Sequence, residues 1–213
     1  MMRVFISVFM FLFFLMPADP LSAQSVFGKF FNELSCFNKK NREEFSQSFD
    51  NFYEVEKNSF YRSKQLSEDR LDFYIKKYGI KTLINLRGNN QKKWWFKEKK
   101  VAEKNGVAFF SIAMSAVRMT KKEHLIELLK IYDTAPRPML VHCIGGADRT
   151  GEASALWVLE KQGKSKGEAL KQLSIKYGHR KYKNSAKDFL IELWQGRAWL
   201  EKSYNHEHYS QQV

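Results

Sequence analysis

The sequence has few of the residues that bind metals or build disulfide frameworks. Among 213 residues there are 2 cysteines, Cys36 and Cys143, and 5 histidines. The histidines are scattered and neither cysteine has a second one nearby, whereas protein metal sites need clustered ligands. The sequence therefore predicts no metal site and no cofactor. A disulfide between Cys36 and Cys143 is compatible only with an oxidising compartment.

Acidic residues are also in short supply. The chain has 23 acidic against 36 basic residues, a formal net charge of +13. Such a charge favours an anionic partner, such as a phosphorylated substrate, an anionic lipid or nucleic acid. No basic tail and no nucleic-acid motif is present, so nucleic acid is not expected, and solvated lysine-rich faces explain part of the charge. We expect a phosphorylated anionic substrate (a lipid, a small molecule or a phosphoprotein) and peripheral contact with a membrane surface.

Long hydrophobic runs are missing, and the longest apolar segment lies at the amino terminus. A short basic start, Met1-Met2-Arg3, precedes an almost purely apolar run over residues 4–16 and a turn-rich segment ending at Ala23. This pattern is typical of a secretory signal peptide, and the run is too short for a comfortable transmembrane helix. The sequence predicts cleavage after Ala23 and export to the periplasm or the exterior. An uncleaved membrane anchor is the alternative.

One stretch in the second half of the chain combines a potential nucleophile with a potential anion cradle. Residues 139–141 predict a buried strand that ends at His142-Cys143, and a helix is expected from Thr150 onward. Small residues at 145–147 let backbone N–H groups turn toward an anion, and the helix amino terminus adds its positive dipole end. The planar fork of Arg149 suits two phosphate oxygens. The same field favours a Cys143 thiolate, to which the Thr150 hydroxyl can donate a hydrogen bond.

This stretch resembles the signature of the protein tyrosine and dual-specificity phosphatase superfamily: His-Cys, five residues, then Arg149-Thr150-Gly151. The segments 51–65 and 79–87 look like the amino-terminal half of bacterial dual-specificity-type phosphatases, so the likeness covers roughly residues 50–180. It implies that Cys143 is the nucleophile, which a disulfide to Cys36 would disable. A buried structural cysteine is the alternative. The phosphate-binding residues implied by the resemblance are Ile144, Gly145, Gly146, Ala147, Asp148 and Arg149.

Strand and helix patterns alternate along the chain, without repeats or interior linkers. We expect a hairpin over 52–62, strands over 81–86 and 107–112, and helices over 67–79, with Ser67 as the N-cap, and over 91–105. Capping boxes at Thr120/Glu123 and Ser165/Glu168 predict two more helices, the second of which ends at Gly178, and a last one is expected over 185–200. This order predicts a single α/β domain with a three-layer-like phosphatase fold and a central, mostly parallel sheet. The predicted parts are a signal peptide (1–23), a lead-in (24–48), the phosphatase domain (49–202) and a loose polar tail (203–213).

The expected general acid is missing from its usual place. In the resembled family an Asp on the loop before the third helix usually protonates the leaving oxygen, but residues 113–119 contain no Asp or Glu. Asp148, directly before Arg149, is the candidate substitute, because some lipid-directed members of the superfamily have an Asp there. The alternative is that Asp148 only supports the loop. The predicted catalytic set is Cys143, Asp148, Arg149 and Thr150.

Several other basic residues could contact substrate, and two of them are expected on the catalytic face: Arg87 and Arg118. His142 is expected to hold the loop backbone through its ring, and the basic corner His179-Arg180-Lys181 is most simply read as solvated charge. Together these features predict an exported phosphomonoesterase that acts through a phosphocysteine on a phosphorylated lipid or another highly anionic molecule. A tyrosine or dual-specificity protein phosphatase and a catalytically weak phosphate-binding module are the alternatives.

Overall fold

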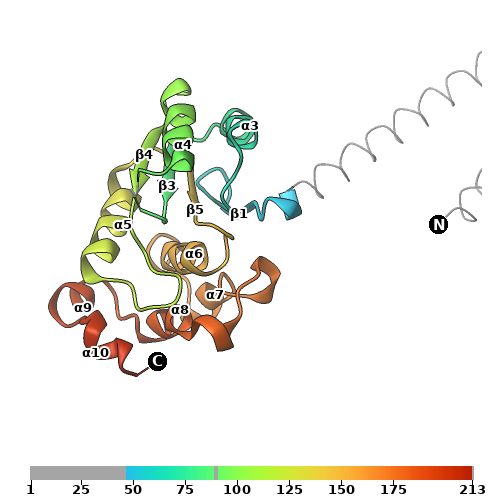
Figure 1. The fold of residues 1–213 in the computed structure, drawn as a ribbon. Helices are drawn as coiled ribbons and strands as arrows, with labels where there is room; N and C mark the ends of the chain where they lie inside the picture. Colours follow the sequence, from blue (N-terminus) through green and yellow to red (C-terminus); the bar gives the residue numbers. More distant parts are fainter. Residues whose placement is uncertain (1–46, 89–90, 213) are drawn as a thin grey trace, which may run out of the picture. The chain divides into compact units, whose positions relative to one another are not determined.

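The computed structural model describes residues 47–88 and 91–212, and a five-stranded sheet forms their centre (Figure 1). The strand order is β1-β2-β5-β3-β4; β1 runs antiparallel to β2 and all other neighbours are parallel. The predicted mostly parallel sheet is therefore confirmed. The predicted signal peptide, and the lead-in up to residue 46, lie outside the described residues. The strands are β1 (Tyr53–Glu56), β2 (Phe60–Ser63), β3 (Thr82–Asn85), β4 (Ala108–Ser111) and β5 (Met139–His142).

Helices cover both faces of this sheet, and none in the described part of the chain is long and apolar enough to cross a membrane. The first four are α3 (Glu68–Tyr78), α4 (Lys93–Lys104), α5 (Lys122–Thr134) and α6 (Asp148–Glu160). The later ones are α7 (Lys166–Leu170), the 3-10 helix η2 (Ile175–Tyr177), α8 (Lys181–Leu193), α9 (Arg197–Lys202) and α10 (His206–Ser210).

The alternation of side chains along the strands creates the layers. Leu83 and Leu140 point into a smaller core with α3 and α4, whereas Ile84 and Val141 point into a larger core with α5, α6 and α8. All four side chains are fully buried. Because each strand buries both faces, its sequence is apolar at successive positions, as parallel strands require. The predicted three-layer α/β arrangement in a single domain is confirmed (Figure 1).

Helix ends agree with the sequence at two predicted caps and differ at a third. The Ser67 hydroxyl accepts from the N–H of Arg70 and begins α3, and the Ser165 hydroxyl accepts from the N–H of Glu168 and begins α7. The predicted capping box at Thr120 is wrong, because α5 begins one residue later without a side-chain cap. Thr120 instead accepts a hydrogen bond from Lys187, 3.0 Å away.

The carboxyl-terminal region contains shorter helices than the periodicity predicts. The expected helix over 185–200 is two helices, α8 and α9, separated at Gly196, which has φ of 92°. The helix expected from Ser165 to Gly178 is likewise α7 followed by η2. The expectation of a loose polar tail is corrected: Tyr204 is buried and donates to the carbonyl of Thr120 at 2.6 Å, and α10 follows it.

Candidate active site

The loop between β5 and α6 carries the predicted nucleophile. Cys143 directly follows β5 and is only 3% exposed, and α6 begins five residues later at Asp148. Gly146 has φ of 72°, and a Cβ placed there would lie 2.7 Å from the backbone of Ser63 and Lys64. Only glycine fits that position, since both the backbone angle and the space exclude a side chain. Cys143 therefore lies at the floor of a tight loop that leads into a helix amino terminus.

Neighbouring segments hold three successive carbonyls of this loop. The Ile144 carbonyl accepts from the N–H of Gln65, at 3.0 Å. The carbonyls of the two glycines that follow accept from the Asn51 side chain at 2.8 Å and from Arg62 Nη2 at 2.7 Å. With its carbonyls bonded in this way, the loop can present N–H groups to a bound anion.

Arg62 is a buried cation that supports the loop from behind. Its other terminal nitrogen donates to the Gln172 carbonyl at 2.7 Å, and its guanidinium lies over the Tyr177 ring. Burial lowers the pKa of Arg62 to about 10, which still leaves it protonated at neutral pH. The resemblance contained this arginine, but only the structure shows that it binds the loop.

His142 connects the loop to α4. Its Nδ1 lies 3.3 Å from the Cys143 carbonyl oxygen, which agrees with the expected ring contact to the loop backbone. Its Nε2 lies 2.7 Å from Glu98 Oε1, and both side chains are buried. Glu98 gave no signal in the sequence, because a single Glu in a basic helix reads as a surface charge.

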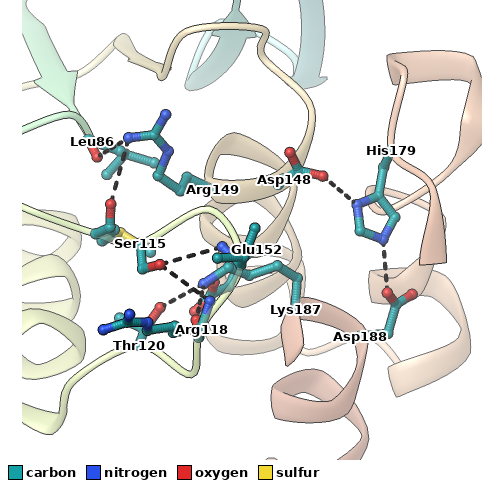
Figure 2. A network of polar contacts seen from close by, with 12 residues as sticks. Leu86, Ser115, Arg118, Thr120, Asp148, Arg149, Glu152, His179, Lys187 and Asp188 are labelled. Carbon is teal, nitrogen blue, oxygen red and sulfur yellow. Dashed lines mark hydrogen bonds and ion pairs between the residues drawn. The ribbon is translucent and has the colours of Figure 1, made fainter. Parts of the chain in front are cut away.

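Arg149 and Arg87 lie near one another beside the loop. Arg149 Nη1 donates to the carbonyls of Leu86 and Met114, at 3.3 and 3.5 Å (Figure 2). Arg87 stacks on the Trp94 ring at 3.5 Å and donates to Gln65 Oε1. Burial and the charge of Arg149 lower the pKa of Arg87. Two neighbouring guanidinium groups attract an anion between them.

The Thr150 hydroxyl lies fully buried in the first turn of α6. It makes no hydrogen bond with any part of the chain that the structure describes. The predicted bond from Thr150 to the Cys143 sulfur is therefore not formed in this structure.

A buried lysine holds the loop over residues 113–119, the loop that usually carries the general acid in the resembled phosphatases. Lys187 of α8 donates to the Arg118 carbonyl at 2.9 Å and pairs with Glu152 of α6 at 2.5 Å (Figure 2). Both ionic side chains are completely buried. The Ser115 hydroxyl accepts from the N–H of Arg118 at 3.1 Å. Lys187 thus holds the loop from α8, Glu152 of α6 pairs with that lysine, and the Ser115–Arg118 bond lies within the loop.

The Arg118 side chain itself is exposed and does not reach the loop of Cys143 through any contact that the structure shows. It lines a groove of about 390 Å³ between the 113–119 loop, the start of α5 and α10. Ala113 and Ser115 form one wall of this groove, and the carbonyl of Met114 between them accepts from Arg149. The other titratable residues of the groove are Lys121, His124, His206 and the acidic Glu207. With Arg118 and Lys121 against Glu207, the groove has a net positive charge, and Met114 beside its wall contacts Arg149.

Asp148 is part of a chain of three titratable groups (Figure 2). His179 Nδ1 lies 2.8 Å from Asp148 Oδ1, and His179 Nε2 lies 2.7 Å from Asp188 Oδ2. Burial by itself lowers the pKa of His179, but the hydrogen bonds to Asp148 and Asp188 outweigh it and raise the pKa to about 9. The interpretation of His179 as solvated charge is wrong, because the residue is only 3% exposed. The position after Gly178 hinted at a tight turn, but nothing in the sequence pointed to Asp188.

The fold and this site define a cysteine-dependent phosphatase. Residues 32–189 match the family described as DSP-PTPase phosphatase fused to NAD+ kinase. Because the match covers most of the chain, the protein belongs to this family, within the dual-specificity branch of the cysteine-based phosphatases. The NAD+ kinase in this description belongs to the definition of the family and is not assigned to this chain. No curated protein matches the chain by sequence.

Several solved structures share the fold. TpbA of P. aeruginosa, crystallised in complex with pTyr, is 19% identical with a TM-score of 0.57, covering 70% of this chain and 86% of its own. The core catalytic domain of the PP-IP phosphatase Siw14 of S. cerevisiae, in complex with citrate, is 19% identical with a TM-score of 0.57, covering 68% and 85%. Tk-PTP in its active form is 20% identical with a TM-score of 0.52, covering 68% and 98%. At these sequence identities the likeness shows a shared fold and no more.

Proposed function

We propose that the protein is a phosphomonoesterase that works through a phosphocysteine intermediate. The observation that carries this proposal is the position of Cys143, which is buried at the start of a loop whose carbonyls are bonded to neighbouring segments and which leads into Arg149 and a helix amino terminus. Such a site offers a nucleophile and an anion cradle together.

In the first step the Cys143 thiolate attacks phosphorus in line with the leaving oxygen. The S–P bond forms as the P–O bond breaks, and the electron pair of that bond goes to the leaving oxygen. Loop N–H groups and the Arg149 guanidinium stabilise the equatorial oxygens. In the second step water attacks phosphorus, the S–P bond breaks and the thiolate is restored.

Asp148 is the proposed general acid. It donates its proton to the leaving oxygen in the first step and takes one from the attacking water in the second, so its protonation is restored over a cycle. Its side chain is 22% exposed and lies next to Arg149 in the chain. The 113–119 loop has no carboxylate and is held by Lys187, which supports an acid from the cysteine loop instead.

We further propose that the substrate is a phosphorylated lipid or another highly anionic molecule, met outside the cytoplasm and at a membrane surface. The net charge of +13, the neighbouring guanidinium groups of Arg87 and Arg149, and the cationic groove at Arg118 support this choice. A tyrosine or dual-specificity protein phosphatase is the second candidate, since TpbA, which shares the fold, binds pTyr.

The mechanism is tested with Cys143→Ser, with Cys36→Ser as the matched control. The Cys143 variant should lose turnover of p-nitrophenyl phosphate yet still bind orthovanadate, because the cradle remains. Rapid acid quench of the wild type with ³²P-labelled substrate should trap phosphate on the protein. Near-normal turnover by Cys143→Ser, or no trapped phosphate in a burst-competent enzyme, would refute the phosphocysteine. Vanadate binding without any wild-type turnover would favour the phosphate-binding module.

The substrate class is tested by comparing kcat/KM for phosphatidic acid, phosphoinositides, lipid A and phosphotyrosine peptides. We expect the lipid and polyphosphorylated substrates to exceed the peptides, and Arg118→Gln to raise KM for them with little change in kcat. Lys130→Gln, an exposed lysine on α5, is the control for lost charge. A preference for phosphotyrosine peptides that Arg118→Gln leaves unchanged would favour the protein phosphatase.

A further inference from the structure

A carboxylate–imidazole–carboxylate chain extends from Asp148 into the interior, and its two buried members, His179 and Asp188, have no part in the mechanism as described so far. It joins α6 to α8 through His179, which stands between η2 and α8. The main chain is fixed there, since Gly178 adopts φ of 82° and the His179 N–H donates to the Ser174 carbonyl. The ring is buried and bonded at both nitrogens, so it has little freedom to turn.

The two carboxylates that bond to the imidazole differ in their exposure to solvent. The Asp188 side chain is 7% exposed and the Asp148 side chain is 22% exposed. Asp188 thus belongs to the protein interior, whereas Asp148 reaches the accessible side. An imidazole held on one nitrogen by a buried carboxylate presents its other nitrogen in a defined direction. Here that direction is toward Asp148 Oδ1.

We propose that His179 is a positioning residue for the Asp148 acid: Asp188 orients its ring, and its Nδ1–H donates to Asp148 Oδ1. The inference rests on the proposed role of Asp148. The anionic phosphate of a bound substrate favours the protonated form of the Asp148 carboxyl. Because Oδ1 is an acceptor in this bond, the proton that the acid transfers is carried on Oδ2. When the P–O bond breaks, the leaving oxygen takes that proton, and the new carboxylate of Asp148 is left beside the positively charged imidazole.

This arrangement would also support the second step. The carboxylate that must accept a proton from water is kept in place by the same bond until the thiolate leaves. Asp188 sits directly after Lys187, which holds the 113–119 loop. One turn of α8 therefore supports both the acid and the loop that faces it.

The test compares two aryl phosphates, phenyl phosphate with a poor leaving group and p-nitrophenyl phosphate with a good one. His179→Gln should lower kcat for phenyl phosphate by about 10–100-fold, and for p-nitrophenyl phosphate by much less, since the latter needs little protonation. His208→Gln, the same change at an exposed site on α10, should alter neither rate. Thermal unfolding and orthovanadate binding report whether fold and cradle persist.

A double variant separates positioning from general damage. If His179 acts only through Asp148, then Asp148→Asn combined with His179→Gln should be no slower than Asp148→Asn alone. Equal losses on both substrates, or a further loss in the double variant, would overturn the inference. If Asp148→Asn itself shows no dependence on the leaving group, the proposed acid has failed, which is a separate result.

A measurement on the wild type covers the case in which His179→Gln does not fold. Long-range ¹H–¹⁵N spectra at pH 7 should show both ring nitrogens of His179 protonated. The Nδ1–H resonance should shift in Asp148→Asn while Nε2–H stays in place. A neutral His179 ring, or an Nδ1 without a proton, would contradict a donor to Oδ1.

Discussion

Asp148 is the residue whose surroundings most affect the chemistry of the site. It begins α6, precedes Arg149 and accepts from His179, so its carboxyl lies between a cationic cradle and a buried imidazole. A carboxyl in this place can act as the acid, and it can also merely hold His179. The two roles differ in how the rate depends on the leaving group and on pH.

Asp148→Asn should reduce kcat for phenyl phosphate by about 10²–10⁴-fold, with a far smaller effect on p-nitrophenyl phosphate. The basic limb of the pH–rate profile should also flatten, because the group that must be protonated is gone. Steady-state kinetics from pH 5 to pH 9 measure both effects. If kcat fell equally for the two substrates and the pH–rate profile were unchanged, Asp148 would have a structural role only.

Gly146 and Gly145 form a matched pair for testing the shape of the loop. Gly146→Ala should abolish activity and cost about 1–3 kcal/mol of stability from backbone strain alone. A Cβ there would meet the backbone of Ser63 and Lys64 at 2.7 Å, whereas a Cβ on Gly145 meets nothing within 4 Å. Gly145→Ala should therefore fold normally. Urea unfolding and turnover of p-nitrophenyl phosphate check the contrast; similar stability of both variants would contradict the loop geometry.

At the scale of elements, α8 connects parts of the site that lie far apart in the sequence. Lys187 reaches the 113–120 segment and Glu152 of α6, and Asp188 reaches His179. The buried lysine is acceptable only because Glu152, Thr120 and the Arg118 carbonyl satisfy it. The position of the 113–119 loop thus depends on a helix more than sixty residues away.

Lys187→Met should destabilise the protein by about 3–5 kcal/mol, because it leaves the Glu152 carboxylate buried without its partner. Lys183→Met, at an exposed position of the same helix, is the control and should change stability little. Adding Glu152→Gln to Lys187→Met should recover part of the loss. Urea unfolding measures stability, and hydrogen exchange of residues 113–120 should increase in Lys187→Met. Unchanged exchange there would mean that the lysine does not hold the loop.

At the scale of the whole molecule, charge governs both stability and partners. The surface is strongly basic, and charged groups are also built into the interior at His142/Glu98, Lys187/Glu152 and the His179 chain. Surface charge acts on partners and can be screened by salt. Among the buried groups, His179 links folding to pH, because its pKa is raised in the folded protein.

Folding stability should fall between pH about 6.5 and about 9. The pKa of His179 is raised to about 9 in the folded protein, against about 6.5 when unfolded. A group whose pKa is raised on folding stabilises the folded state fully at a pH below its unfolded pKa. That stabilisation is lost as the pH rises through the folded pKa. Urea unfolding at pH 6 and pH 9.5 should show the loss in the wild type, and a smaller one in His179→Gln. The same slope in both proteins would show that another group is responsible.

Export predicts that the mature protein begins at Gln24. Amino-terminal sequencing of the protein purified from its native host, together with fractionation of the cells, measures this. A chain that begins at Met1 and sediments with the membrane would support the uncleaved anchor instead.

The sequence by itself determined the features that depend on local order. Apolar runs of strand length alternate with helical periodicity, and the run from His142 to Gly151 places a cysteine, small residues and Arg149 at fixed spacing. Since both the anion cradle and the strand–loop–helix unit are built from neighbouring residues, they could be predicted, as were the caps at Ser67 and Ser165.

Only the tertiary structure decided which distant residues complete the site. Arg62 binds the cysteine loop from β2, Glu98 binds His142 from α4, and Asp188 reaches Asp148 through His179. Each of these is a charged residue that, by pattern alone, looks like an ordinary surface charge. Their burial distinguishes them, together with partners that lie 9 to 84 residues away along the chain, and no local spacing encodes such contacts. For the same reason Thr120, a plausible helix cap by sequence, serves instead as an acceptor for Lys187, because the buried ammonium of that lysine needs oxygen partners.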